Sequence, residues 1–246
     1  ESILLACKAY RDFYKYQNPE VIISSTAHAA FDKAAEYFGL TLIKLEPNIE
    51  TRKLDINTVK KNITRNTILI VASAPSFSHG IIDPIKDLSI LAKKKNIGLH
   101  VDCCLGGFIV PFLDDIEEFD FRLTGVTSIS ADFHKYGLTP KGSSIIMYNN
   151  KDLVHSQYFI SPNWSGGIYA TSNMTGSRCG NIVAITWATL LFVGYNKYKA
   201  IALKIKNSLK YFIENINDNN TLSNNIFIYG KPKVNVLALG SKKIDI

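Results

Sequence analysis

Short β-rich runs alternate with longer stretches of helical periodicity through most of the chain, and this alternation constrains the fold more than any other feature. Parallel strands need crossover connections of a dozen or more residues, usually containing a helix, and the spacing of the runs provides them. The pattern therefore predicts an α/β fold with a mainly parallel sheet covered by helices. The six predicted strands are residues 21–24, 42–45, 67–72, 97–101, 128–131 and 144–148.

Three of the stretches between these runs have the apolar spacing of amphipathic helices. The first covers residues 29–38. The second covers residues 56–63 and follows Asp55, which is a good N-cap residue. The third covers residues 85–94 and follows Pro84. Each of the three is long enough to serve as a strand crossover.

The C-terminal part of the chain has a different pattern. A long helical segment is predicted over residues 182–216, with a break near Gly194. Residues 215–225 are polar and are expected to form a loop. Strand-like runs follow at residues 226–229 and 234–239. We expect these runs to begin a second, smaller domain.

The charge balance is basic, with 28 Lys and Arg residues against 21 Asp and Glu residues and a formal net charge of +7. Only five of the basic residues are Arg, the residue that contacts phosphates and base edges in a bidentate manner. The densest basic cluster, residues 93–95, lies at a predicted helix C-terminus, where the helix dipole favours cations. Charge thus makes nucleic-acid binding a minor alternative. The most apolar stretch, residues 182–193, is shorter than the ~18 residues of a membrane span.

The four cysteines form no CxxC pair, which favours neither a disulfide scaffold nor a zinc site. Cys103 and Cys104 are adjacent, and two adjacent ligands can seldom both point at one tetrahedral metal centre. We therefore interpret them as packing residues or a redox-sensitive thiol, and we expect no metal.

Polar residues with reactive side chains follow three of the predicted strands, where the chemistry of open α/β sheets gathers. Asp102 follows residues 97–101, and His28 follows residues 21–24. Lys135 follows residues 128–131. A strand-end carboxylate followed 33 positions later (135 − 102) by a His-Lys turn is typical of a pyridoxal phosphate enzyme. The lysine amine, freed of its proton by burial and nearby positive charge, would join the cofactor aldehyde, while the aspartate would keep the ring nitrogen protonated.

Longer strings of residues make the pattern more specific. They resemble those of the sphingosine-1-phosphate lyases, a family in the group II decarboxylase branch of the fold type I pyridoxal phosphate enzymes. The resemblance covers the whole chain. The strings are residues 25–35, 100–108, 125–137, 140–144, 166–170 and 176–178.

This resemblance implies a role for each of eight residues. Three would hold the cofactor ring: Lys135 by the covalent link, Asp102 at the ring nitrogen and His28 by stacking. The other implied residues are Ser177 for the cofactor phosphate, His134 and His79 for catalysis, and Lys141 and Tyr169 for the substrate. Read without the resemblance, His28 is a helix-start residue, His134 orients its turn, and Lys141 is a solvated loop charge.

The resemblance also implies an activity and an assembly. The expected enzyme cleaves the C2–C3 bond of phosphorylated sphingoid bases to a long-chain aldehyde and phosphoethanolamine, in sphingolipid catabolism. The expected partner is a second copy of the chain, with active sites shared across the homodimer. The expected location is the endoplasmic reticulum membrane, with the catalytic domain facing the cytosol and held by an N-terminal anchor. This chain by itself is expected to be soluble.

The resemblance implies further segments beyond both ends of the sequence. Residues 1–217 would form the large cofactor-binding domain without its N-terminal glycine-rich phosphate-binding turn, and residues 218–246 would start a truncated small domain. Cys103 and Cys179 depart from the family pattern, and Cys179 would loosen residues 176–180.

Two other functions remain open beside the lyase. An amino acid decarboxylase of the same branch would use the same Lys, Asp and His. A non-catalytic interaction protein on the same fold would bind no cofactor.

Overall fold

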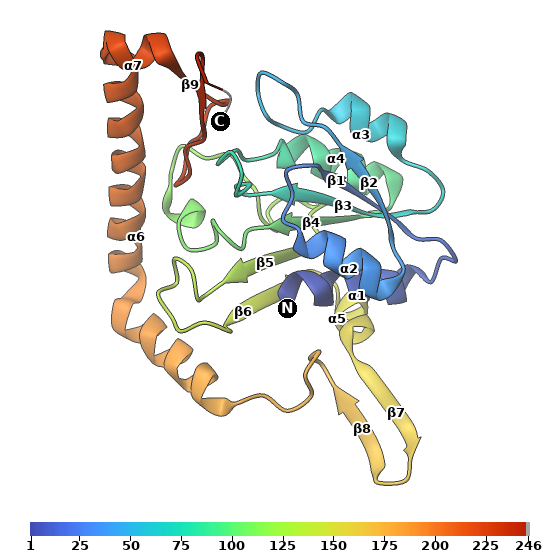
Figure 1. Cartoon of the computed structure of the whole chain (residues 1–246). Helices are drawn as coiled ribbons and strands as arrows, with labels where there is room; N and C mark the ends of the chain where they lie inside the picture. The colour runs from blue at the N-terminus through green and yellow to red at the C-terminus, as the bar shows by residue number, and fades with distance from the viewer. Residues whose placement is uncertain (245–246) are drawn as a thin grey trace.

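The computed structural model describes residues 1–244 and contains a six-stranded central sheet (Figure 1). The strands follow the order β2-β1-β3-β4-β5-β6, in which only the β5–β6 pair is antiparallel. The mainly parallel α/β sheet predicted from the sequence is therefore confirmed. The strands are β1 Glu20–Ser24, β2 Thr41–Leu45, β3 Thr67–Ser73, β4 Gly98–Asp102, β5 Ser128–Asp132 and β6 Ser144–Tyr148.

Helices cover both faces of this sheet, which explains why every residue of β3, β4 and β5 is buried. Successive strand residues point to opposite faces, so Val21 and Ile23 join one core cluster while Ile22 joins the other. Helices α1 (Ser2–Tyr14) and α2 (Ala30–Phe38) pack on the first face. Helices α3 (Ile56–Asn62) and α4 (Ile85–Lys95) pack on the second.

The helix boundaries have local causes. The Asp55 side chain caps α3 and accepts a hydrogen bond from the backbone N–H of Thr58 at 2.7 Å, as the sequence predicted. Helix α2 ends at Gly39, whose φ of 64° lies in the left-handed region that glycine adopts without strain. Helix α4 ends with Lys93, Lys94 and Lys95 in its last turn. The sequence did not predict α1, the one-turn helix η1 (Val110–Phe112) or α5 (Lys151–Gln157).

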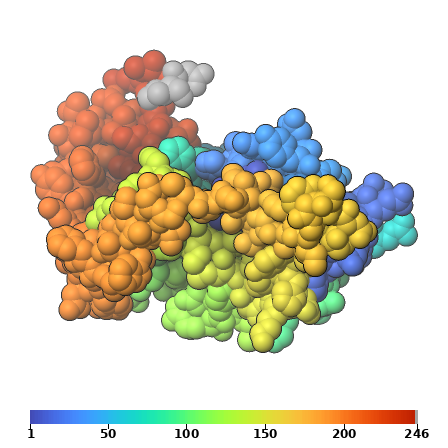
Figure 2. Space-filling view, turned by 90° about the horizontal axis from the view of Figure 1, so that it is seen from below, coloured from blue at the N-terminus to red at the C-terminus, as the bar shows by residue number. Residues whose placement is uncertain are grey.

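A hairpin and a long helix extend from the sheet domain. Strands β7 (Phe159–Trp164) and β8 (Gly167–Thr171) form a separate antiparallel pair. Helix α6 (Gly180–Asp218) is interrupted at Gly194, which has φ 66° and ψ 167°, so the predicted break is confirmed. Figure 2 shows the hairpin in yellow and the start of α6 in orange forming much of one side of the molecule.

Two expectations about the C-terminal part are wrong. The predicted loop 215–225 is helical, because α6 continues to Asp218 and α7 (Asn220–Asn225) follows directly. Asn219 allows this by capping α7 and accepting hydrogen bonds from the backbone N–H groups of Thr221 and Leu222. The run 234–239 is mostly irregular: β10 spans Leu239–Ser241 and pairs with β9 (Ile226–Ile228). Among the residues that the structure describes, no helix is long and apolar enough to cross a membrane.

Candidate functional site

A cavity of about 370 Å³ opens at the carboxyl ends of the parallel strands. Strands β1, β3, β4 and β5 are neighbours in the sheet, so polar residues far apart in sequence meet at this edge. The cavity brings together four of the eight predicted residues, His28, Asp102, His134 and Lys135. A larger cavity of about 430 Å³, beside Asp83, contains none of the predicted residues.

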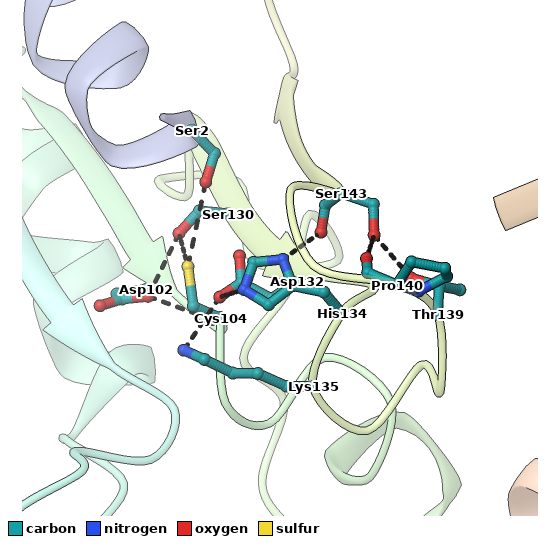
Figure 3. A network of polar contacts seen from close by, with 10 residues as sticks. All are labelled: Ser2, Asp102, Cys104, Ser130, Asp132, His134, Lys135, Thr139, Pro140 and Ser143. Carbon is teal, nitrogen blue, oxygen red and sulfur yellow. Dashed lines mark hydrogen bonds and ion pairs between the residues drawn. The ribbon is translucent and has the colours of Figure 1, made fainter. Parts of the chain in front are cut away.

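The amine of Lys135 forms an ion pair with a carboxylate that the sequence interpretation had not assigned. Its Nζ atom lies 2.9 Å from Oδ2 of Asp132, the last residue of β5 (Figure 3). Burial by itself lowers the pKa of Lys135, but the hydrogen bond and negative charge of Asp132 outweigh it, so the net shift is upward. The sequence led us to expect a positive charge beside Lys135, which would favour the free amine. The structure places the negative charge of Asp132 there instead.

Asp102 ends β4 and is only 7% exposed. One of its carboxylate oxygens, Oδ1, accepts hydrogen bonds from the backbone N–H of Cys104 at 3.1 Å and from the Ser130 hydroxyl at 3.2 Å. Within residues 1–244 no donor contacts the other oxygen, Oδ2. The carboxylate is thus held by one oxygen, and the other is available to a group in the cavity.

The two histidines at the cavity differ in how firmly they are held. His28 is exposed, and its Nδ1 accepts a hydrogen bond from the backbone N–H of Ala30 at 3.0 Å, at the start of α2. His134 contacts the carbonyl oxygen of Ser143 through Nδ1 at 2.6 Å, and its Nε2 lies 3.5 Å from Asp132. Because a carbonyl only accepts, His134 carries a proton on Nδ1. The flat, exposed ring of His28 is the one free to stack on a ligand.

The remaining four predicted residues do not line this cavity. Lys141 is exposed on the turn that precedes β6. His79 contacts the Ser78 hydroxyl at 2.8 Å and packs edge-on against Tyr229, with 5.5 Å between the ring centroids. Burial, reinforced by the charge of Arg52, lowers the pKa of His79. His79 therefore faces the C-terminal segment instead of the cavity.

Tyr169 and Ser177 belong to the hairpin side of the molecule. Tyr169 lies on β8 and packs against Phe159 and Trp164 of β7, with ring centroids 6.3 and 6.2 Å apart. Ser177 is exposed in the segment between β8 and α6. The next residue, Arg178, forms an ion pair with Glu1, which lines the cavity. This ion pair holds the segment at the edge of the site.

Sequence reasoning missed several residues that line the cavity. Asp132 directly follows the predicted strand 128–131 and was detectable by the strand-end rule that found Asp102. The first residues of α1, Ser2 and Ile3, carry no such signal. They bring a helix N-terminus to the cavity, where unpaired N–H groups and the helix dipole favour an anion. Ser73, Ser76 and Phe77 complete the wall after β3.

Comparison with known proteins identifies relatives of this chain. The model described as the pyridoxal-dependent decarboxylase conserved domain matches residues 6–236. The chain is 46% identical to sphingosine-1-phosphate lyase 1 of Rattus norvegicus over 257 residues, which is 100% of the chain and 44% of that relative. It is 45% identical to sphingosine-1-phosphate lyase of Saccharomyces cerevisiae over 262 residues, 100% of the chain and 43% of that relative. The chain thus spans less than half the length of these curated relatives.

Solved structures show the same similarity. The Burkholderia pseudomallei K96243 sphingosine-1-phosphate lyase matches with a TM-score of 0.93 and 37% identity, covering 100% of this chain and 57% of that one. A glutamate decarboxylase from Lactobacillus brevis matches with a TM-score of 0.83 and 21% identity, covering 99% of this chain and 58% of that one. At that identity the second match shows a common fold only.

Proposed function

The chain belongs to the pyridoxal-dependent decarboxylase family, and from this membership we propose that the protein cleaves the C2–C3 bond of phosphorylated sphingoid bases. The products would be a long-chain aldehyde and phosphoethanolamine. The observation that carries the proposal is the meeting of Lys135, Asp102 and His28 on one cavity. The similarity to sphingosine-1-phosphate lyases, strong along the whole chain, supports this substrate class over an amino acid.

The cavity suits pyridoxal phosphate, the cofactor of this family. It offers a lysine for the covalent link, a carboxylate with a free oxygen for the ring nitrogen, and an exposed imidazole for the ring face. Its volume of about 370 Å³ is within the usual range for small-molecule sites. The N-terminus of α1 provides an anion-binding group for the cofactor phosphate. We propose that Ser177 also contacts a cofactor phosphate, at the site of a partner copy.

When bound, pyridoxal phosphate supplies a reversible covalent attachment for the substrate amine and withdraws the electrons that the broken bond leaves on C2. Asp102 would hold the proton on the ring nitrogen, which strengthens that withdrawal. A base removes the proton of the C3 hydroxyl, and C3 becomes the aldehyde carbon. Lys135 or His134 would then deliver a proton to C2, since both side chains face the cavity.

The residues outside the cavity have proposed roles toward the phosphorylated substrate. Lys141 would bind the substrate phosphate through its ammonium group. His79 and Tyr169 would donate hydrogen bonds to the substrate. Because Tyr169 and Ser177 lie on the exposed hairpin side, we propose that they act at the site of a partner copy in a homodimer.

Exposed apolar side chains on that side support the homodimer. Ile168 of the hairpin is 79% exposed, and Trp187 and Phe192 of α6 are 65% and 83% exposed. Large apolar side chains that are exposed to this degree are candidates for burial in an interface between copies of the chain. We further propose residues 1–217 as the large domain, residues 218–246 as the start of a small one, and the endoplasmic reticulum membrane as the location, with the catalytic domain facing the cytosol.

The test is a side-by-side assay of two products. The full-length protein, loaded with cofactor, is expected to release a long-chain aldehyde from a phosphorylated sphingoid base and no CO2 from common amino acids. Lys135→Ala is expected to abolish aldehyde release, whereas Lys95→Ala, a change on the far end of α4, leaves it unchanged. CO2 release without aldehyde would assign the protein to the decarboxylases.

A second variant tests the role of Asp102. In Asp102→Asn the amide oxygen still accepts from Ser130 and Cys104, but a neutral amide cannot stabilise a positive ring nitrogen. Cofactor binding should remain measurable, while the single-turnover rate falls by about 100-fold or more. Near-native single-turnover rates in this variant would exclude the assigned role.

A further inference from the structure

A chain of hydrogen bonds runs through the buried interior from α1 to the Asp102 carboxylate. From the carboxylate, Ser130 Oγ lies 3.2 Å away, and His100 Nε2 lies 3.1 Å beyond it. The other ring nitrogen of His100, Nδ1, lies 2.8 Å from Ser128 Oγ. The Tyr10 hydroxyl follows at 2.8 Å from Ser128. The last member is Thr127 Oγ1, which lies 2.6 Å from Tyr10 and 2.9 Å from the backbone N–H of Leu99.

We propose that this chain is a directional relay, in which every hydrogen from Tyr10 onward points toward Asp102, and that Ser130 and His100 are positioning residues for that carboxylate. The proposal rests on the proposed role of Asp102 at the cofactor ring nitrogen. The role of Asp102 by itself gives no function to four buried residues, and the relay gives each of them one: Ser130, His100, Ser128 and Tyr10.

The direction follows first from the carboxylate end. An ionised carboxylate can only accept hydrogen bonds, so the Ser130 hydroxyl donates its one hydrogen to Asp102. Ser130 must then accept from His100, and His100 therefore carries a proton on Nε2. The Cys104 thiol, 3.3 Å away, also donates to Ser130. Burial raises the pKa of Cys104 well above its usual value, so the thiol keeps its proton.

The charge state of His100 fixes the rest of the chain. Its ring is fully buried, and burial lowers the pKa of His100 to about 4, against a smaller upward effect of Asp102. A neutral ring with its proton on Nε2 has a bare Nδ1, so Ser128 must donate to it. Tyr10 then donates to Ser128. The Thr127 hydroxyl lies near two acceptors, the Tyr10 oxygen at 2.6 Å and the carbonyl oxygen of Leu99 at 3.1 Å, so the direction is fixed from Tyr10 to Asp102. The backbone N–H of Leu99 donates a hydrogen bond to Thr127 Oγ1. From Tyr10 to Ser130, each hydroxyl gives its one hydrogen to the next member of the chain toward Asp102.

The relay has a physical consequence at the cavity. Hydrogen bonds that run in one direction polarise each other in a low-dielectric interior, which strengthens the last bond to the carboxylate. That bond holds Oδ1 (Figure 3), and Oδ2, which has no donor among the described residues, remains available to a ligand in the cavity that Asp102 lines. Partners of this kind behind metal ligands typically change affinity or activity by 10- to 100-fold when removed, and we expect a comparable effect here.

The first test uses nuclear magnetic resonance of the full-length protein without cofactor, labelled with ¹⁵N in histidine. The signal of His100 is identified by its loss in His100→Gln. We expect a neutral ring with the proton on Nε2 at neutral pH, and a mixture of the two neutral forms in Ser130→Ala. A proton on Nδ1 in the unmodified protein, or a charged ring, would overturn the relay whatever the protein's function.

The second test compares Ser130→Ala with Ser89→Ala, which removes another buried hydroxyl, one whose only hydrogen-bond partner within residues 1–244 is the backbone N–H of Gly125. Ser130→Ala is expected to lower kcat by about 10- to 100-fold with little change in KM, and Ser130→Thr is expected to restore it. Ser89→Ala should leave kcat unchanged while lowering stability to a similar degree. Equal kcat values for the two alanine variants would refute a positioning role. If the ¹⁵N result holds but Asp102→Asn retains full turnover, the relay stands and the proposed role of Asp102 fails.

Discussion

At the scale of single residues, the closest contact of Lys135 opposes the chemistry proposed for it. An amine attacks an aldehyde only after it has lost its proton, yet Asp132 stabilises the protonated form of Lys135 from 2.9 Å. The pair must therefore be broken or neutralised when the cofactor arrives. Before that, Asp132 keeps the lysine charged and unreactive.

Asp132→Asn is expected to remove this restraint. The pKa of Lys135 should fall, and each unit of decrease gives about tenfold more free amine at a fixed pH below that pKa. Covalent attachment of the cofactor should therefore extend to lower pH in the variant. The adduct on Lys135 can be trapped with borohydride at a series of pH values and quantified by peptide mass analysis. Asp120→Asn, which removes an exposed ion pair with Arg122, is the control. An unchanged pH dependence would show that Asp132 does not govern the amine.

At the scale of secondary structure, the elements that could be predicted are those whose signals are local. The predicted strand 67–72 differs by one residue from β3, because an unbroken buried apolar run is typical of a central strand. The cap of α3 was equally clear at Asp55. The helix α7 was mistaken for a loop, because Asn-rich segments favour turns unless a particular side chain, here Asn219, caps a helix.

The residues of the candidate site also divide into those that could be predicted from the sequence and those that could not. Asp102, Lys135 and His28 could be found because each follows a strand, and neighbouring parallel strands end at one edge. The position of His79 could not be found, because it depends on Tyr229, which is 150 residues away in the chain (229 − 79). The relay behind Asp102 was also out of reach, since it depends on the register that aligns His100 with Ser128.

Helix α6 provides a prediction about backbone conformation. Gly194 has φ 66° and ψ 167°, a combination that is essentially restricted to glycine. A Cβ atom at Gly194 or at Gly180 would meet nothing within 4 Å, so the two positions differ mainly in backbone conformation. Gly194→Ala is expected to lower the free energy of unfolding by about 1–3 kcal/mol. Gly180→Ala, the control, is expected to change it by less than about 1 kcal/mol. Equal denaturation midpoints for the two variants would contradict this origin of the break.

At the scale of the whole molecule, the proposed homodimer is testable with two matched isoleucines. Ile168 on the hairpin is 79% exposed, and Ile49, in the segment between β2 and α3, is 77% exposed. A carboxylate introduced into an apolar interface costs several kcal/mol of association, whereas one in water costs little. Ile168→Asp is expected to shift the full-length protein toward monomer in sedimentation analysis, and Ile49→Asp is not. A stable dimer with Ile168→Asp would place the interface elsewhere.

Two buried titratable groups are expected to give the stability of the molecule opposite dependences on pH. Burial raises the pKa of Asp83 to about 6, so the folded state binds its proton more tightly, and stability falls as pH rises from about 4 to 6. Burial lowers the pKa of His100 to about 4, so the unfolded state binds more protons, and stability rises from about pH 4 to 6.5. Each effect is on the order of 3 kcal/mol and they largely cancel.

Removing one of the two groups should therefore reveal how the other makes the free energy of unfolding depend on pH. With Asp83→Asn the free energy of unfolding is expected to rise more steeply with pH between about 4 and 6.5, and with His100→Gln it is expected to fall. Urea titrations at several pH values in this window measure both. Parallel curves for the two variants would contradict the opposed pair.

The cavity has walls from the ends of four parallel strands, and this has a consequence for how the protein matures. His28 follows β1 and Lys135 follows β5, so the site does not exist until all the intervening crossovers have been made. Parallel pairing of this kind is slow, because the connecting segments must close, at a cost in chain entropy, before the stabilising contacts between strands can form. A ligand that requires the finished cavity then stabilises only the completed molecule, by about 2.7 kcal/mol at a concentration one hundred times its Kd. The cellular abundance of the protein is therefore expected to rise and fall with the supply of pyridoxal phosphate.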